Sequence, residues 1–202
     1  MFGSFGSILV FAAHPDDAEY GCGGLLASLP SARKVVVVAT DGRDPRRVPE
    51  LIQANSVLGC NVRRLKARES WLEHAYLLDR FDEALSEVNP DLVLAHWPDD
   101  THQDHVTVGH AAMGALRAYR GTAMFYPMPS SIGFDPTVFS EVSSEAWERK
   151  VRAIKCHATQ AEKPYFSDAA MDLDSRKWSV YYRGNPATRC EAFRLYRAVR
   201  SL

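Results

Sequence analysis

The sequence predicts an α/β protein with a Rossmann-like, mostly parallel sheet flanked by helices in three layers. Three observations support this prediction. Short apolar segments alternate with segments of helical periodicity four or five times along the chain, which is the pattern of parallel βαβ units. Residues 34–40 form a β-branched run that suits a strand covered on both faces. Polar loops follow the ends of predicted strands, where open α/β sheets bind ligands.

The same patterns place the individual elements. Strands are expected at residues 8–13, 34–40, 61–65, 92–96, 123–128, 134–142 and 190–196. Helices are expected at residues 21–29, 47–58, 72–88, 104–119 and 144–159. Pro30 ends the first helix and Gly59 supplies the stop of the second. Residues 164–177 are predicted to form a loop or a short helix.

Bulk properties narrow the class of protein. A length of 202 residues, with 46% hydrophobic and 24% charged residues, predicts one domain over residues 1–202. The formal net charge of −1 argues against nucleic-acid partners or a polybasic membrane surface. The four cysteines lie far apart without a C-x-x-C pair, so neither a disulfide framework nor a thiolate zinc site is predicted.

The sequence shows neither the pattern of a membrane span nor that of a signal peptide. No run approaches the ~20 apolar residues of a membrane span, and the N-terminus lacks the pattern of a signal peptide. We therefore expect a cytoplasmic protein with no integral membrane segment. The sequence leaves the oligomeric state open, including a homo-oligomer.

Two dense polar clusters follow predicted strands. The first is His-Pro-Asp-Asp at residues 14–17, and the second ends in His-Gln-Asp-His at residues 102–105. Each alone could be a capping turn or a polar helix entrance. Neighbouring carboxylates beside an imidazole are costly unless a cation or a proton shares the site. If the two strands are neighbours in the sheet, the clusters converge and form one functional site.

The residue types in the two clusters favour a catalytic metal. His14, Asp17 and His105 offer two imidazoles and one carboxylate, which suit zinc with open positions, although Fe²⁺ or another divalent metal suits the same ligands. Zinc acidifies bound water to a pKa near ~7. Asp16, beside a ligand, is placed to take a proton from that water. His102 is predicted to stabilise an oxyanion or protonate a leaving amine.

Other polar and aromatic residues have weaker assignments. Asp104 is a candidate partner that holds a histidine in the right tautomer. Asp41 and Arg43 lie in a loop at the same edge and are candidates for substrate binding, with a solvated turn as the alternative. Trp97 and Trp178 suit either stacking on a sugar ring or packing in the core.

These motifs resemble those of the PIG-L/LmbE-like zinc-dependent N-deacetylases, whose members remove acetyl groups from N-acetylglucosamine-type sugars in small conjugates or glycolipids. The resemblance extends over about residues 8–196 and rests mainly on residues 13–19, 21–24, 40–42 and 102–105, together with Arg47, Glu50, Ala54, Leu58 and Gly59. Weaker matches follow at residues 155–160, which include His157, and at residues 191–193.

The resemblance implies a role for each matching position. His14, Asp17 and His105 would bind zinc and Asp16 would be the general base. His102 would stabilise the tetrahedral intermediate or act as an acid. Arg47 would contact the sugar or its substituent. The expected partner is a small N-acetylated amino sugar.

Three alternatives remain open at this stage. The same ligands suit a non-haem iron enzyme or another metal-dependent amidase, and a relative of the family could bind a sugar without catalysis. A dinucleotide-binding domain is disfavoured because Leu26 occupies the position of the third glycine in the G-x-G-x-x-G pattern. The favoured prediction is a zinc-dependent hydrolase that removes an N-acetyl group.

Overall fold

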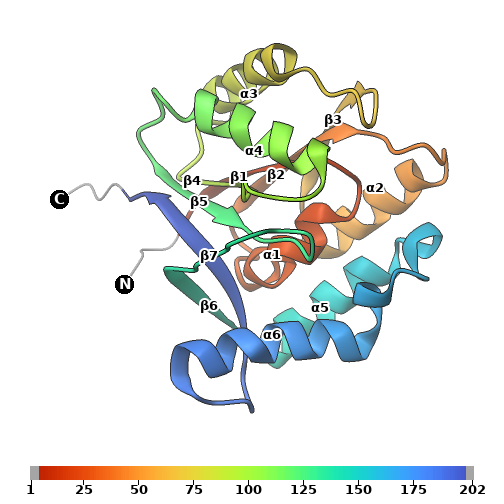
Figure 1. Cartoon of the computed structure of the whole chain (residues 1–202), viewed down its shortest axis with the longest axis vertical. Helices are drawn as coiled ribbons and strands as arrows, with labels where there is room; N and C mark the ends of the chain where they lie inside the picture. The colour runs from red at the N-terminus through yellow and green to blue at the C-terminus, as the bar shows by residue number, and fades with distance from the viewer. Residues whose placement is uncertain (1–4, 199–202) are drawn as a thin grey trace.

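The computed structural model describes residues 5–198, which form three layers around one seven-stranded sheet (Figure 1). The strands are β1 (Ser7–Ala12), β2 (Arg33–Thr40), β3 (Asn61–Ala67), β4 (Leu92–His96), β5 (Thr122–Tyr126), β6 (Val138–Val142) and β7 (Arg189–Arg197). The helices are α1 (Asp17–Ser28), α2 (Arg47–Leu58), α3 (His74–Val88), α4 (Gln103–Ala115), α5 (Ser144–Lys155) and α6 (Asp168–Arg183). Two 3-10 turns, η1 (Ala158–Gln160) and η2 (Pro164–Phe166), connect α5 to α6.

The strand order confirms the predicted mostly parallel sheet. The order is β3-β2-β1-β4-β5-β7-β6, and β1 to β5 run parallel while β7 is antiparallel to both of its neighbours. The chain builds outward from β1 to β3 and then returns to place β4 on the other side of β1. Ligands bind in α/β sheets at such a reversal of strand order. The edge beyond β1 and β4 is therefore where the fold favours a binding site.

Alternation along the strands builds a core on each face of the sheet. Val10 and Val36 face the layer formed by α1, α2 and α5, while Phe11 and Val37 face α3 and α4. Figure 1 shows α3 and α4 on one side of the sheet and α1 on the other. Since both faces are covered, the central strands are apolar on both sides, as parallel sheets require.

One buried cation joins the ends of two helices to the start of β2. The Lys34 ammonium donates to the carbonyl of Leu26 near the end of α1 at 3.0 Å and to that of Leu58 at the end of α2 at 2.7 Å. Helix C-termini carry carbonyls without intrahelical partners and a partial negative charge. Lys34 therefore satisfies two helix ends at once. Gly59 ends α2, as the sequence predicted, and does so in a left-handed conformation.

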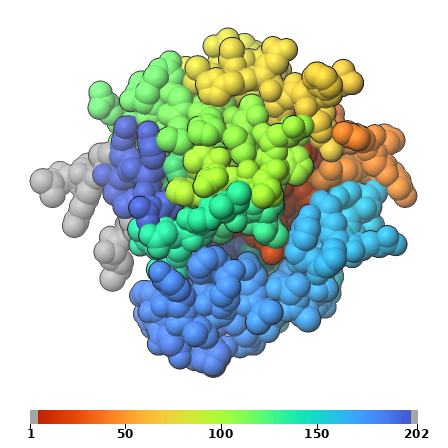
Figure 2. Space-filling view, viewed as in Figure 1, coloured from red at the N-terminus to blue at the C-terminus, as the bar shows by residue number. Residues whose placement is uncertain are grey.

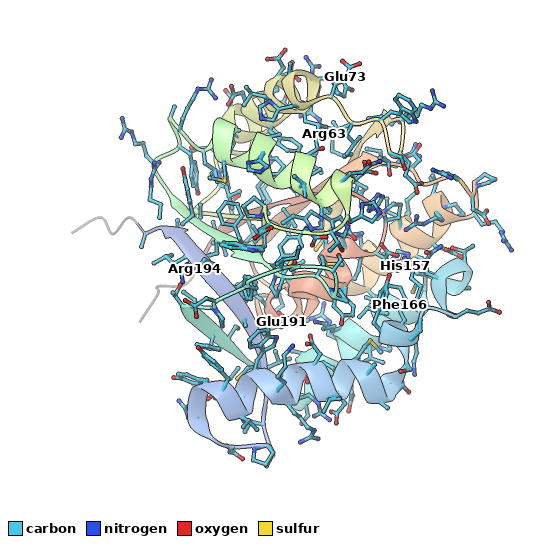
Figure 3. All side chains as sticks on the ribbon, viewed as in Figure 1. Arg63, Glu73, His157, Phe166, Glu191 and Arg194 are labelled. Atoms are coloured by element: carbon cyan, nitrogen blue, oxygen red, sulfur yellow. The ribbon has the colours of Figure 1, made fainter. Side chains whose placement is uncertain are left out.

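A second buried charge fixes α1 against β7. The Glu191 carboxylate accepts the backbone N–H groups of Gly24 and Leu25, each at 2.7 Å, and the Lys150 ammonium from α5 at 2.6 Å. Figure 3 labels Glu191 at this junction. Gly24 on α1 permits this close approach, because a Cβ atom at this position would lie only 3.0 Å from the Glu191 carboxylate.

The structure differs from the sequence prediction at the ends of several elements and at one whole helix. Helices α4 and α5 end at Ala115 and Lys155 rather than near residues 119 and 159, and β6 begins at Val138 rather than near residue 134. Helix α1 begins at Asp17 rather than near residue 21. Helix α6 has 16 residues where the sequence predicted a loop or a short helix. The buried positions of α6 are Met171, Ser175 and Ser179. Two of these three positions carry serine, so the segment lacks the apolar periodicity that identifies a helix.

None of the helices within residues 5–198 is long and apolar enough to cross a membrane.

Candidate active site

The two polar clusters of the sequence meet at the reversal of strand order. β1 and β4 are parallel neighbours, and the loops that follow them lie at the same edge of the sheet. They enclose a pocket of about 370 Å³. Its lining residues are His14, Asp16, Asp17, Arg47, Glu69, His102, His105, Met128, Pro129, Ser130, Gln160, Lys163, Tyr165 and Phe166. Figure 2 shows a hollow between the lime-green start of α4 and the light-blue segment before α6, with red atoms of the N-terminal part at its bottom.

Asp17 is locked in place by the strand end that precedes it. Its Oδ2 accepts the backbone N–H of Ala13 at 3.1 Å and that of His14 at 2.7 Å, and lies 3.0 Å from His96 Nε2. Its other oxygen, Oδ1, lies 3.6 Å from His105 Nε2. One carboxylate oxygen is thus occupied by the protein, while the other faces the neighbouring histidine.

His14 and His105 each have one ring nitrogen close to a carboxylate other than Asp17. His14 Nε2 lies 3.0 Å from Asp104 Oδ2, and His14 Nδ1 lies 3.4 Å from Asp17. His105 Nδ1 lies 3.3 Å from Asp100 Oδ1, while its Nε2 faces Asp17. Histidine ligands of metals are oriented in this way, with the second ring nitrogen donating to a carboxylate.

The three side chains fit a divalent metal. One ligand atom each from His14, Asp17 and His105 lies within 4.8 Å of the others. His14, His102 and Asp104 form a second group at this spacing, but Asp104 Oδ2 is engaged by His14 Nε2 and by the backbone N–H of Ser70. Two imidazoles and a carboxylate with all three side chains buried match the donor set of catalytic zinc.

The electrostatics of this group favour a positive charge. Burial opposes ionisation of Asp17, but the histidines around it, led by His105, hold its pKa well below its usual range. Burial also opposes protonation of both histidines, yet the Asp17 carboxylate raises the pKa of His14 to about 10 and that of His105 to about 9. Without a metal these imidazoles would hold protons, and a bound cation would replace that charge.

Asp16 occupies a strained turn directly before α1. Its φ is 114°, in the left-handed region, and its side chain makes no capping bond to the helix. Such a backbone costs about 1–3 kcal/mol and clusters at functional sites. Oδ2 accepts hydrogen bonds from Arg47 at 3.1 Å and Lys163 at 3.2 Å. Burial and the adjacent Asp17 raise the pKa of Asp16, while the two cations oppose that rise. The geometry does not match a simple capping turn.

His102 caps the start of α4 and lines the pocket. Its Nδ1 accepts the backbone N–H of Asp104 at 3.2 Å. In the neutral ring the proton then sits on Nε2. Burial and the two neighbouring histidines, His105 and His14, lower the pKa of His102, so the neutral form is favoured. His102 is therefore a hydrogen-bond donor at Nε2.

The remaining predicted residues have different positions. Arg47 is buried and lines the pocket, where its guanidinium holds Asp16 and the carbonyl of Pro15. Asp41 pairs with Arg64 at 3.1 Å. Exposed Arg43 hydrogen-bonds to Ser70. Asp41 and Arg43 are outside the pocket lining within residues 5–198, so their contact with substrate stays a prediction.

Several pocket residues were not assigned from the sequence. Lys163, Tyr165 and Phe166 come from the segment between α5 and α6, where Figure 3 labels His157 and Phe166. His157 itself is buried and lies 3.5 Å from Glu19. No motif identifies Lys163, because its contact with Asp16 joins residues 147 positions apart.

Comparisons with known proteins identify the family of this chain. The family described as "PIG-L: GlcNAc-PI de-N-acetylase" matches residues 9–116, which include both polar clusters. An uncharacterized deacetylase of Escherichia coli K12, YaiS, is 32% identical, over 74% of this chain and 89% of YaiS. A probable N-acetyl-alpha-D-glucosaminyl L-malate deacetylase 2 of Bacillus subtilis 168 is 29% identical, over 77% of this chain and 83% of the relative.

A solved structure shares the fold. The conserved protein TT1542 from Thermus thermophilus superposes with a TM-score of 0.80 at 24% identity, covering 96% of each chain. The family match spans more than half of the sequence, and YaiS is similar over most of its length. The chain therefore belongs to the PIG-L family of de-N-acetylases.

Proposed function

We propose that the protein is a zinc-dependent hydrolase that removes the acetyl group from an N-acetylglucosamine-type sugar or small sugar conjugate. The observation that carries the proposal is the convergence of His14, Asp17 and His105 within 4.8 Å in the pocket that Asp16 and His102 also line. Metal ligands, a further carboxylate outside the ligand set and a hydrogen-bond donor around one cavity are the components of metal-assisted amide hydrolysis.

The metal site depends on residues outside the ligand set. Asp104 and Asp100 hold the outer nitrogens of His14 and His105, so the other nitrogen of each ring faces Asp17. Zinc in this site would supply a Lewis acid that makes water more acidic and polarises a carbonyl oxygen.

Asp16 is the proposed general base. Arg47 and Lys163 both approach its Oδ2, which leaves Oδ1 to accept a proton from the attacking water. The two cations also fix the rotamer of this side chain in the pocket. When the C–N bond of the acetamide breaks, Asp16 returns the proton to the leaving nitrogen, so acetate and an amine are the products.

His102 is the proposed stabiliser of the developing oxyanion. Since its Nδ1 accepts a backbone N–H of α4, Nε2 carries a proton that can be donated to a negatively charged oxygen. A donor held in place before the reaction contributes most to stabilising such a charge.

The substrate class is supported by the relatives. The matching family is described as acting on GlcNAc-PI, and the Bacillus subtilis relative is described as acting on an N-acetyl-alpha-D-glucosaminyl malate. For this chain we therefore infer an N-acetylated amino sugar. The four cysteines of the structure are free thiols, which fits a reducing compartment, and we propose the cytoplasm.

The test measures metal content and acetate release on the purified full chain. Wild type loaded with zinc should hold about one ion per chain and release acetate from N-acetylglucosamine-type sugars. The His105→Ala variant should lose the metal and the activity because one of three ligands is gone.

His110→Ala is the matched control, since His110 is an exposed histidine on the same helix. It should keep both metal and activity. Stoichiometric zinc in His105→Ala would contradict the ligand set. Oxygen-dependent turnover with iron and none with zinc would favour a non-haem iron enzyme instead.

A further inference from the structure

A smaller pocket adjoins the active site. It has a volume of about 230 Å³ and shares Met128 and Pro129 with the 370 Å³ active-site pocket. Its lining residues are Tyr20, Pro127, Met128, Pro129, Ser131, Phe134, Asp174, Lys177 and Trp178. We call it the α6 pocket, because three of its lining residues come from that helix.

The size of the α6 pocket indicates an extension of the active site. Pockets that bind a small molecule on their own have volumes of about 300–1,000 Å³. The active-site pocket falls in that range and the α6 pocket falls below it. A ligand that fills the first and continues past Met128 and Pro129 would reach the second.

Ser131, which lines the α6 pocket, is linked through Asp100 to one predicted metal ligand, His105. Ser131 Oγ donates to Asp100 Oδ2 at 2.9 Å, and Asp100 in turn lies 3.3 Å from His105 Nδ1. The Trp97 indole N–H donates to the carbonyl of Ile132 at 2.9 Å. Trp97 thus has a structural contact, whereas Trp178 lines the α6 pocket. The segment that follows Pro129 is therefore held by hydrogen bonds at both Ser131 and Ile132.

The chemistry of the α6 pocket suits a polyhydroxylated ring. Phe134 and Trp178 pack with their ring centres 5.8 Å apart and offer apolar surface. Asp174 and Lys177 lie 2.6 Å apart and offer an acceptor and a donor with no net charge. An acyl chain would displace water from this ion pair and offer it no polar group in return. An anionic group would meet the Asp174 carboxylate beside Lys177.

We propose that the α6 pocket binds a second pyranose ring attached to the acetamido sugar, with Trp178 as its main apolar contact. This proposal rests on the proposed deacetylase function. It implies that the preferred substrate is at least a disaccharide rather than a free amino sugar.

The test compares two substrates in matched variants of the zinc-loaded full chain. Wild type should have a kcat/KM for N,N′-diacetylchitobiose at least about tenfold above that for N-acetylglucosamine, because the second ring adds apolar contact. Trp178→Ala should lower the disaccharide value about tenfold and leave the monosaccharide value within about twofold. Tyr182→Ala, an aromatic residue of α6 outside the pocket lining, should change neither value.

Lys177→Met provides a second variant that does not depend on core packing, since this side chain is about half exposed. Lys177→Met should lower kcat/KM for the disaccharide and leave kcat/KM for the monosaccharide unchanged. Equal losses for both sugars, or no loss for the disaccharide in Trp178→Ala, would overturn the proposal.

If wild type releases acetate from neither sugar, the proposed function fails, and calorimetric titration with N,N′-diacetylchitobiose then tests the pocket separately. Binding that weakens about tenfold in Trp178→Ala supports the pocket. Equal binding in both proteins, or none in wild type, overturns it.

Discussion

Two adjacent carboxylates have opposite environments in this site. Asp17 is surrounded by three histidines that hold its pKa well below the usual range, whereas burial and Asp17 itself raise the pKa of Asp16. The left-handed backbone at Asp16 separates the two side chains, so that one faces His105 and the other faces Arg47 and Lys163. Carboxylates whose environments separate their pKa values take different roles in catalysis.

Replacing Asp16 tests this division of roles. Asp16→Asn should keep one zinc per chain, because the amide leaves all three ligands in place. It should lower kcat for acetate release by about 10²–10⁴-fold, since general base catalysis contributes that much. Metal analysis and acetate release measure the two effects on the same sample.

Asp99→Asn serves as the control, because Asp99 is an exposed carboxylate that follows the neighbouring strand β4 and does not line the pocket within the described residues. It should behave as wild type. Unchanged turnover in Asp16→Asn would rule out Asp16 as the base, and loss of zinc would assign it to metal binding.

At the scale of single residues, the sequence identified side chains that follow strands directly. His14, Asp16 and Asp17 stand next to β1 in the chain, so their residue types and position suggested a shared site. Lys163 could not be found in this way. It reaches Asp16 only because the segment between α5 and α6 folds back over the pocket, and no local pattern encodes that contact.

At the scale of elements, buried charges position helices against the sheet. Lys34 joins the ends of α1 and α2 to β2, and Glu191 joins β7 to the backbone of α1. α1 follows Asp16 and Asp17 directly, so these contacts also fix the backbone that presents the site.

Lys34→Met should destabilise the protein by about 2 kcal/mol. The methionine fills similar space but leaves the carbonyls of Leu26 and Leu58 without their buried donor, and each unsatisfied buried acceptor costs about 1–3 kcal/mol. The release of a buried charge offsets part of this loss. Urea unfolding of the two proteins measures the difference as a lower midpoint.

Arg33→Met is the matched control, because Arg33 is the exposed neighbour of Lys34 on β2. Its free energy of unfolding should stay within about 0.5 kcal/mol of wild type. A Lys34→Met protein as stable as this control would show that solvent or backbone rearrangement replaces the lost hydrogen bonds.

Helix α6 is the element that the sequence did not predict at its full length. The sequence predicted α2, α3 and α4 because their buried faces carry apolar residues, as Leu77 and Phe81 do in α3. In α6 the buried serines interrupt that pattern. The α6 pocket could not be predicted for the same reason, since the helix that lines it was not expected.

At the scale of the whole molecule, topology assembles the site. The two clusters are separated by about ninety residues, and only the placement of β4 beside β1 brings them to one edge. Sequence alternation predicted a parallel sheet, but the order of its strands required the structure. Given that order, the pocket lies at the reversal point where α/β sheets bind ligands.

The metal-free molecule should lose stability as the pH rises, while zinc should reverse the trend. The folded-state pKa values of His14 and His105, about 10 and about 9, lie above the ordinary value near 6.5. Protonation of these rings therefore stabilises the metal-free fold fully below about pH 6.5, and this contribution is lost as the pH rises through about 9 to 10. Zinc requires the same rings to be deprotonated, so its stabilisation grows with pH.

Thermal unfolding of metal-free and zinc-loaded protein between pH 6 and pH 9.5 measures both trends. The gap in Tm should widen with pH, and zinc at about a thousand times its Kd should add about 4 kcal/mol. His105→Gln removes one of the two titrating rings. It should therefore weaken the dependence of the metal-free Tm on pH and abolish most of the Tm difference between zinc-loaded and metal-free protein. A metal-free protein whose stability rises between pH 7 and pH 9.5 would show that Asp17 does not hold these histidines in their protonated form.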